Sequence, residues 1–240
     1  MAADPIANAQ QLLADVWPQI EAASAGKPPV FPRQLVWLNG APGAGKGTNT
    51  RTIMQILAIE RQPVVVSDLL SSPEFIKIKN SGALVGDKDV VGLLLKKLLD
   101  PQYAAGAIVD GFPRSPAQAE FLRLLVAKLE QLAVAHPGVC AKPSLRVVVL
   151  NVAEDVAVER QIKRGREAVQ SNEAARKFGG RVEEIRATDV DPASAAKRYR
   201  VFQEQTVGAL QSLTGAFPCH FIDAGADIPA VARAIELALA

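Results

Sequence analysis

A glycine-rich turn between an apolar run and a helical pattern is the feature that most restricts how this chain can fold. Residues 34–39 read QLVWLN, which is typical of a buried strand, and residues 40–48 follow at once as GAPGAGKGT. Glycines allow such a turn to wrap a phosphate chain with several backbone N–H groups pointing inward. Lys46 can then reach the terminal phosphates of a nucleotide. The pattern predicts a phosphate loop between the first strand and the first helix of an α/β protein.

The position after the lysine departs from the general phosphate-loop pattern. Ser or Thr usually follows the lysine directly, and its hydroxyl binds the metal ion of the nucleotide. Here Gly47 intervenes and Thr48 comes next. We therefore expect Thr48 to contact a phosphate rather than a metal ion.

Short apolar runs alternate with helical patterns along the rest of the chain. Strands are expected at 34–39, 63–67, 106–110, 145–152 and 220–223, and helices at 48–59, 72–100 in two or three pieces, 116–135, from 155 onward, 192–213 and 229–239. Strands of this kind, separated by helices, favour a parallel sheet covered on both faces. Residues 34–240 are therefore predicted to form one three-layer α/β domain around a five-stranded parallel sheet.

Residues 1–33 are expected to form a helical extension followed by a stiff, proline-rich linker. Asp4 and Pro5 are typical of a helix start, and apolar residues recur at helical spacing as far as Ile20. Two interpretations stay open: a helix packed on the outside of the domain, or one that docks a partner or a second copy. The segment lacks the features of a secretory signal and of a mitochondrial presequence, so we expect a cytoplasmic protein.

The net charge of +2 hides an uneven distribution along the 240 residues. Residues 160–200 hold eleven Lys and Arg against six Asp and Glu, which leaves this segment at +5 and the rest near −3. Residues 165–190 also interrupt the apolar pattern, which indicates a basic insertion that can move. A local basic patch favours a small anionic partner, whereas the low net charge does not indicate nucleic-acid binding. No apolar run reaches the roughly 18 residues of a membrane span. Cys140 and Cys219 are expected to be reduced, buried thiols, with a disulfide between them as the alternative.

Further motifs accompany the glycine-rich loop. Residues 82–85 read GALV, residues 110–114 read DGFPR, Gln118 follows, and residues 220–223 read HFID; the basic segment contributes Arg160, Arg164, Arg186, Asp189 and Arg198. Together with GAPGAGKGT, these residues resemble the adenylate kinases and related nucleoside monophosphate kinases, a family of phosphate-loop kinases. The likeness extends from about residue 34 to residue 239.

The resemblance implies Mg²⁺-dependent transfer of a phosphoryl group from ATP to AMP, which gives two ADP without a covalent intermediate. An acceptor phosphate is mostly ionised at neutral pH, so the reaction needs surrounding cations rather than a general base. Two alternatives stay open: a kinase for UMP, CMP or another nucleoside monophosphate, and a catalytically weak regulatory module that binds nucleotides. The expected partners are ATP, AMP and ADP, with no nucleic acid or membrane, and the expected state is a monomer.

The same resemblance implies the residues of the site. The cations expected around the transferring group are Lys46, Arg114, Arg160, Arg164, Arg186 and Arg198. ATP is expected at Gly43, Ala44, Gly45, Lys46, Gly47, Thr48 and Arg160, with its adenine against the backbone of residues 225–228. AMP is expected at Ser67, Asp68, Leu84, Val85, Gly111, Arg114 and Gln118, in a helical insertion over about residues 67–100. Asp110 is expected to hold Mg²⁺ through water, and the alternative or additional role is to cap the turn before Phe112. A mobile lid is expected over about residues 160–198, and because it contains no Cys, no zinc is expected there.

Several positions depart from the family's pattern. Ser71 stands where the family usually has an arginine that holds the acceptor phosphate, and Val66 stands where a hydroxyl residue is usual. Lys77 or Lys79 is a candidate to supply the missing charge. In the lid, Arg181 is an alternative to Arg186.

Overall fold

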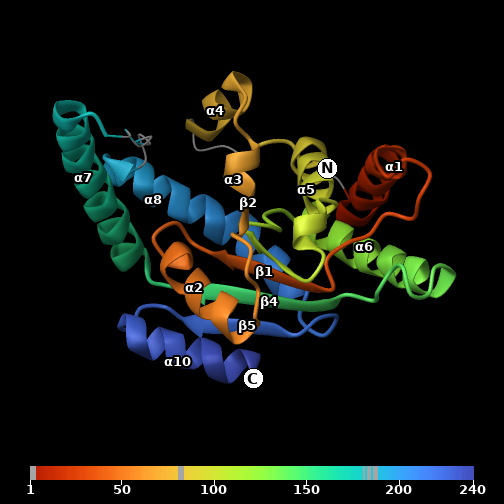
Figure 1. The fold of residues 1–240 in the computed structure, drawn as a ribbon. Coiled ribbons are helices and arrows are strands. Elements are labelled where there is room, and N and C mark those ends of the chain that lie inside the picture. The colour runs from red at the N-terminus through yellow and green to blue at the C-terminus, as the bar shows by residue number, and fades with distance from the viewer. Residues whose placement is uncertain (1–3, 81–83, 181, 183–184, 186–188) are drawn as a thin grey trace.

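A five-stranded parallel sheet forms the centre of the molecule (Figure 1). The structure is a computed structural model that describes residues 4–80, 84–180, 182, 185 and 189–240. The strands are β1 (Gln34–Gly40), β2 (Val64–Val65), β3 (Ala107–Asp110), β4 (Ser144–Asn151) and β5 (Cys219–Asp223), in the order β2-β3-β1-β4-β5. Every neighbouring pair in this sheet is parallel. The predicted α/β fold with five parallel strands is confirmed.

β1 lies in the middle of the sheet because both of its faces are apolar. Residues 35–38 are at most 1% exposed. The register pairs Leu38 with Asp110 of β3 and Gly40 with Leu150 of β4. Because parallel strands end at the same edge, the loop after β1 lies beside the segment that follows β3. This topology brings the phosphate loop and the DGFPR motif together.

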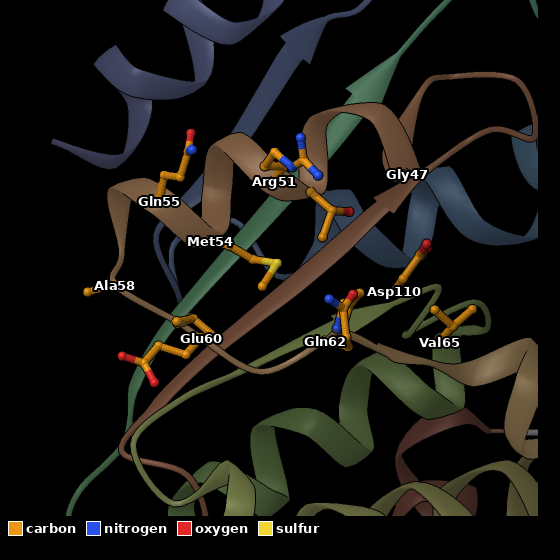
Figure 2. A pocket seen from close by; sticks show the side chains of 12 residues that line it. Gly47, Arg51, Met54, Gln55, Ala58, Glu60, Gln62, Val65 and Asp110 are labelled. Carbon is orange, nitrogen blue, oxygen red and sulfur yellow. The ribbon is translucent and has the colours of Figure 1, made fainter.

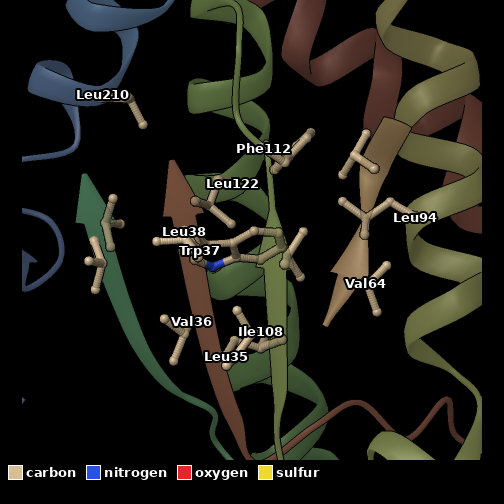
Figure 3. Close-up of a cluster of buried hydrophobic side chains, with 14 of the residues drawn as sticks. Leu35, Val36, Trp37, Leu38, Val64, Leu94, Ile108, Phe112, Leu122 and Leu210 are labelled. Carbon is tan, nitrogen blue, oxygen red and sulfur yellow. The ribbon is translucent and has the colours of Figure 1, made fainter. Parts of the chain in front are cut away.

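Aromatic and branched side chains fill the core beside β1 (Figure 3). Trp37 of β1 and Phe112 are both fully buried, with ring centroids 5.3 Å apart and planes tilted by 46°. Leu122 of the helix above them is buried in the same cluster. Phe112 lies between Asp110 and Arg114 in the DGFPR motif. Its burial therefore anchors the segment that carries both of these charged residues.

Helices cover both faces of the sheet (Figure 1). On one face, α2 (Lys46–Ile56) packs against α10 (Ile228–Leu239); on the other, α6 (Pro116–Ala135) packs against α5 (Asp87–Leu98) and α9 (Gly208–Ser212). Side-chain caps begin several of these helices: Ser115 accepts from the N–H of Gln118, and Asp227 accepts from that of Ala230. The helix predicted at 116–135 coincides with α6.

The first helix, α1 (Pro5–Ala23), packs onto the domain. Asp4 Oδ1 accepts a hydrogen bond from the N–H of Ile6 at 3.0 Å, which caps the helix start. The buried face faces α6 and α5 and consists of Ala9, Leu12, Val16, Trp17 and Ile20. Asp15 also pairs with Lys88 of α5 at 2.8 Å. Of the two interpretations that the sequence left open, the structure shows the helix packed on the outside of the domain.

The strand predicted at 63–67 is shorter than expected. Only Val64 and Val65 form β2, and the chain then turns into the short helix α3 (Val66–Leu69). β2 lies at the edge of the sheet and pairs with β3 alone, so few ladder hydrogen bonds oppose the turn into a helix. The helices predicted within 72–100 are α4 (Pro73–Asn80) and α5, and the 3₁₀ turn η1 (Pro101–Tyr103) follows them.

The helix predicted from residue 155 onward is α7 (Glu154–Phe178), which continues into the polar, basic segment that begins at residue 165. Gly165 lies within this helix, and a Cβ built on it would come 1.9 Å from the carbonyl oxygen of Asp189. The glycine therefore permits a close contact between two segments rather than ending a helix. Residues 192–213 are helical as predicted, in three consecutive pieces: α8 (Pro192–Val201), the π-helical η3 (Phe202–Val207) and α9.

Cys140 and Cys219 are free thiols, and both are half-buried rather than buried. No described helix is long and apolar enough to cross a membrane. Within the described ranges, no three His, Cys, Asp or Glu side chains gather as a metal-binding group.

Candidate active site

The glycine-rich loop joins β1 to α2 and passes close to α7. Gly43 has a φ of +84°, and a Cβ at this position would lie 2.3 Å from the carbonyl oxygen of Ala157. Glycine is therefore required both for the backbone conformation and for the contact. α2 begins at Lys46, directly after the loop, so its N-terminal N–H groups and its dipole favour an anion at this point.

Lys46 folds back over the loop that precedes it. Its Nζ donates to the carbonyl oxygens of Gly40 at 2.8 Å and Ala41 at 3.2 Å. Burial lowers the pKa of the ammonium to about 8, although Asp110 opposes this shift. The positive charges of Arg114, Arg198 and Arg164 lower the pKa further. Four cations from separate segments of the chain therefore share one electrostatic environment.

Asp110 ends β3 beside the phosphate loop and is half-buried. Burial raises the pKa of its carboxyl group, Lys46 and Arg114 lower it, and the nearby charge of Asp68 raises it. A single carboxylate next to a phosphate site fits Mg²⁺, which keeps several waters and binds one or two carboxylates together with substrate phosphates. Asp110 is therefore the residue that would hold this ion.

Arg114 is fixed by hydrogen bonds on three sides. Its Nε donates to the carbonyl oxygen of Gly111 at 2.7 Å, and its backbone N–H donates to Oε1 of Gln118 at 2.8 Å. Its carbonyl oxygen accepts from the Thr206 hydroxyl at 3.0 Å. The Nε contact orients the guanidinium and the other two fix the backbone of Arg114, and the charge of the guanidinium acts on both Asp110 and Lys46.

Gln118 is buried at the start of α6, with 3% of its surface exposed. Its Nε2 donates to Asp87 Oδ1 at 2.8 Å, while the Ser115 hydroxyl donates to Asp87 Oδ2 at 2.9 Å. Leu84 and Val85, half-buried and buried respectively, lie just before Asp87. Gln118 is therefore bonded to the segment that carries Leu84 and Val85, the other two residues predicted near the AMP base.

Asp189 links two of the predicted lid arginines. Its Oδ1 lies 2.7 Å from Arg164 Nη2 and 3.9 Å from Arg198 Nη1. Asp189 itself is only 8% exposed. Arg186 and its alternative, Arg181, lie outside the described residues. The structure therefore brings Arg164 and Arg198 together at one carboxylate.

Arg160, four residues before Arg164 in α7, contacts the segment that follows β5. Its Nη1 donates to the carbonyl oxygen of Ala224 at 2.8 Å, and its Nη2 to that of Gly225 at 3.4 Å. It lines a cavity of about 530 Å³ between the loop and the β5–α10 turn, together with Ala44, Gly45, Thr48, Asn49, Ala224, Ala226, Asp227, Ile228, Pro229 and Val231. This cavity includes much of the backbone that the sequence predicts for the ATP adenine. Arg160 therefore lies on its wall.

The segment predicted to hold the acceptor begins at α3. The Ser67 hydroxyl donates to Asp68 Oδ1 at 3.2 Å. Ser71, which takes the place of the family's arginine, is exposed. Lys77 is exposed on α4, and the side chain of Lys79 lies outside the described part of the structure.

A second cavity, of about 630 Å³, follows the length of α2 (Figure 2). Gly47 and Asp110 lie at the end near the phosphate loop, and Ala58 and Glu60 lie at the far end of α2. Val65 of β2 also lines it. The carboxyl group of Asp110 is thus open to this cavity as well as close to the loop.

The sequence analysis missed residues that hold the site together. Asn39, 1% exposed, accepts from the N–H of Gly40 and donates to the carbonyl oxygen of Pro113 at 2.7 Å, which connects β1 to the DGFPR segment. Thr206 and Asp87 have similar roles toward Arg114 and Gln118. A polar Asn at the end of an apolar strand is a signal for the first of these. The other two depend on contacts between distant segments.

A parallel sheet with a glycine-rich loop, a lysine at the following helix start and clustered arginines defines a phosphate-loop protein that binds nucleotides. Comparisons with known proteins agree. The family model described as an AAA domain matches residues 39–177, more than half of the chain.

Curated relatives with full-length similarity are adenylate kinases. The Bartonella bacilliformis adenylate kinase is 32% identical over 84% of this chain and 97% of its own length, and that of Methylobacterium radiotolerans is 33% identical over 81% and 93%. The Gloeobacter violaceus adenylate kinase is 40% identical over 53% of this chain and 56% of its own. The chain belongs to the adenylate kinase family of nucleoside monophosphate kinases. It is therefore an enzyme that transfers phosphoryl groups between nucleotides.

Proposed function

We propose that this enzyme transfers the γ-phosphoryl group of ATP to AMP and produces two molecules of ADP. The observation that carries the proposal is the placement of four cations around the phosphate loop: Lys46 lies on the loop carbonyls, Arg114 on Gly111, and Arg164 and Arg198 on Asp189, and the three arginines act on the Lys46 charge. A transferring phosphoryl group carries negative charge on three oxygens, and cations placed in advance stabilise it. Arginine suits this task because its planar fork binds phosphate oxygens in pairs.

The two nucleotides approach from opposite sides of this cluster. The cavity next to Arg160 is suited to the adenine of ATP, whose phosphates then extend along the loop to Lys46. Asp110 would hold Mg²⁺, and the bound ion would neutralise negative charge on the phosphate oxygens. The acceptor phosphate lies toward Arg114, and its base lies toward Gln118. Because the acceptor is itself a phosphate, it attacks without losing a proton to the protein.

The acceptor identity is supported by Gln118, whose amide offers both a donor and an acceptor to a purine base. UMP or CMP is the second candidate for the acceptor. The observation that supports this alternative is Ser71, which stands where the family usually has an arginine that holds the acceptor phosphate. A regulatory module that only binds nucleotides is less well supported, because such a module has no need of four clustered cations.

A coupled assay with ATP, Mg²⁺ and a panel of monophosphates tests the proposal. We expect the highest kcat/KM with AMP and lower values with UMP, CMP and GMP. A higher kcat/KM with UMP or CMP would reassign the acceptor. Tight ATP binding with no turnover for any monophosphate would contradict the proposal and favour the regulatory module.

A further inference from the structure

The carboxylate of Asp87 joins the start of α5 to the start of α6, two helices that pack side by side (Figure 1). Asp87 is the first residue of α5, and it accepts hydrogen bonds from Gln118 Nε2 at 2.8 Å and from the Ser115 hydroxyl at 2.9 Å. Ser115 caps α6, and Gln118 lies in the first turn of that helix. Both carboxylate oxygens are therefore engaged by the helix that carries the predicted base-reading residue.

The two partners of Gln118 determine which end of its amide carries the oxygen. The backbone N–H of Arg114 can only donate, so it faces Oε1, at 2.8 Å. The Asp87 carboxylate can only accept, so it faces Nε2. Because Gln118 is only 3% exposed, turning the amide over would bury a donor against a donor and an oxygen against a carboxylate.

We propose that Asp87 is a positioning residue that sets the base specificity of the acceptor site by fixing the orientation of the Gln118 amide. This inference rests on the proposed function, in which the acceptor base lies at Gln118. In the fixed orientation, one lone pair on Oε1 and one N–H on Nε2 remain for a ligand. A 6-aminopurine offers the complement, a donor at N6 and an acceptor at N1. A 6-oxopurine offers the reverse, an acceptor at O6 and a donor at N1.

The charge of Asp87 matters because a neutral amide in its place does not impose the same restriction. Asn has the shape of Asp, but its own amide can turn so that either Oδ1 or Nδ2 faces Gln118. With Asn at this position, turning the Gln118 amide would leave only the contact with the Arg114 N–H unfavourable. Asp87→Asn should therefore let the site accept a 6-oxopurine more readily.

The experiment compares AMP with IMP, which share their size and sugar and reverse the donor and acceptor at N1 and C6. Discrimination between bases by one paired contact is typically about tenfold or more. We expect the ratio of kcat/KM for AMP to that for IMP to fall about tenfold in Asp87→Asn. Asp89→Asn is the matched control, since it removes the same charge from an exposed position in the same turn of α5 and should leave the ratio unchanged.

An unchanged ratio in Asp87→Asn would overturn the inference, and so would an equal loss of activity toward both acceptors, which a purely structural role predicts. In a Gln118→Ala background, Asp87→Asn should no longer change the ratio.

If Asp87→Asn does not fold, Ser115→Ala removes one of the two partners of the carboxylate, and we expect a smaller fall in the same ratio. The affinities of AMP and IMP, measured by calorimetry, give the ratio independently of turnover. A wild-type enzyme that binds AMP but does not phosphorylate it contradicts the proposed function and not this inference.

Discussion

Lys46 occupies the point where the loop backbone, Asp110 and three arginines act on one ammonium group. Replacing it with Met removes the charge but keeps a similar length. We expect Lys46→Met to lower kcat by at least about a hundredfold, since this is the usual loss when one pre-positioned donor to a transition state is removed. Arg114→Ala should have an effect of the same order. Steady-state kinetics provides the measurement, and circular dichroism checks the fold.

Lys96→Met is the matched control for this prediction, because Lys96 is exposed on α5 and distant in sequence from the loop. Its kcat should equal that of the wild type. Near-normal kcat in Lys46→Met or Arg114→Ala would mean that neither residue acts on the transferring group.

The pKa of Lys46, about 8 in the free enzyme, predicts a pH dependence. As the pH rises through this value the ammonium loses its proton, so kcat/KM for ATP should fall about tenfold per unit at higher pH. The phosphates of bound ATP stabilise the charged form, so kcat should persist to higher pH than kcat/KM. Burial raises the pKa of Asp110. On the acidic side, kcat/KM should therefore begin to fall at a higher pH than the titration of an ordinary carboxyl group would give. A kcat/KM profile that stays flat between pH 7 and pH 10 would contradict the role of Lys46.

At this scale the glycine-rich loop predicts Lys46 from its local spacing, and the resemblance of the DGFPR segment to the family implies Asp110, Arg114 and Gln118. They do not identify Asn39 or Asp87, because the contacts of these residues join segments far apart in the chain. Motif spacing also does not reveal that Arg160 bonds to the backbone of Ala224 and Gly225.

At the scale of elements, α7 passes close to the segment that carries Asp189. A methyl group on Gly165 would meet the carbonyl oxygen of Asp189 at 1.9 Å, so one of the two segments must move. We expect Gly165→Ala to lower the free energy of unfolding by about 1–3 kcal/mol, a typical cost of overpacking. Because Asp189 holds Arg164 and Arg198, kcat should fall as well. Denaturant unfolding and steady-state kinetics provide the two measurements.

Gly208→Ala makes the same substitution in α9, where a Cβ would meet nothing within 4 Å. It should stabilise the protein by up to about 1 kcal/mol, because Ala restricts the unfolded chain. If both variants were equally stable, the close contact at Gly165 would have no energetic effect.

The boundaries of elements could be predicted where local signals set them. Ser115, with a proline after it, marks the start of α6, and the helix begins there. β2 is shorter than its apolar run suggests, since its length depends on having a single neighbouring strand. The end of α7 at Phe178 has no apolar periodicity to mark it, and Gly165 within the helix serves a contact with a segment more than twenty residues away.

At the scale of the whole molecule, α1 adds a layer over α5 and α6 that is distant in sequence from the site motifs. Trp17 is 6% exposed, stacks on Phe31 with ring centroids 6.3 Å apart, and donates from Nε1 to Glu21 at 2.7 Å. We expect Trp17→Ala to lower the free energy of unfolding by about 3–5 kcal/mol, the usual loss for a buried aromatic side chain. The KM values for both nucleotides should change little.

Val134→Ala is the control for this prediction, since Val134 is 83% exposed on α6 and its truncation leaves no cavity. Its unfolding curve should superimpose on that of the wild type. A Trp17→Ala protein as stable as the wild type would show that α1 contributes nothing to the stability of the domain.

The central claim, that two nucleotides exchange one phosphoryl group between the loop and Arg114, is tested most directly by the product balance. Purified enzyme is incubated with equal amounts of ATP and AMP and Mg²⁺, and the nucleotides and inorganic phosphate are quantified by anion-exchange chromatography. We expect two ADP to form for each AMP consumed, with no release of inorganic phosphate. ADP formation that is independent of AMP and matched by inorganic phosphate would contradict the claim and indicate hydrolysis of ATP.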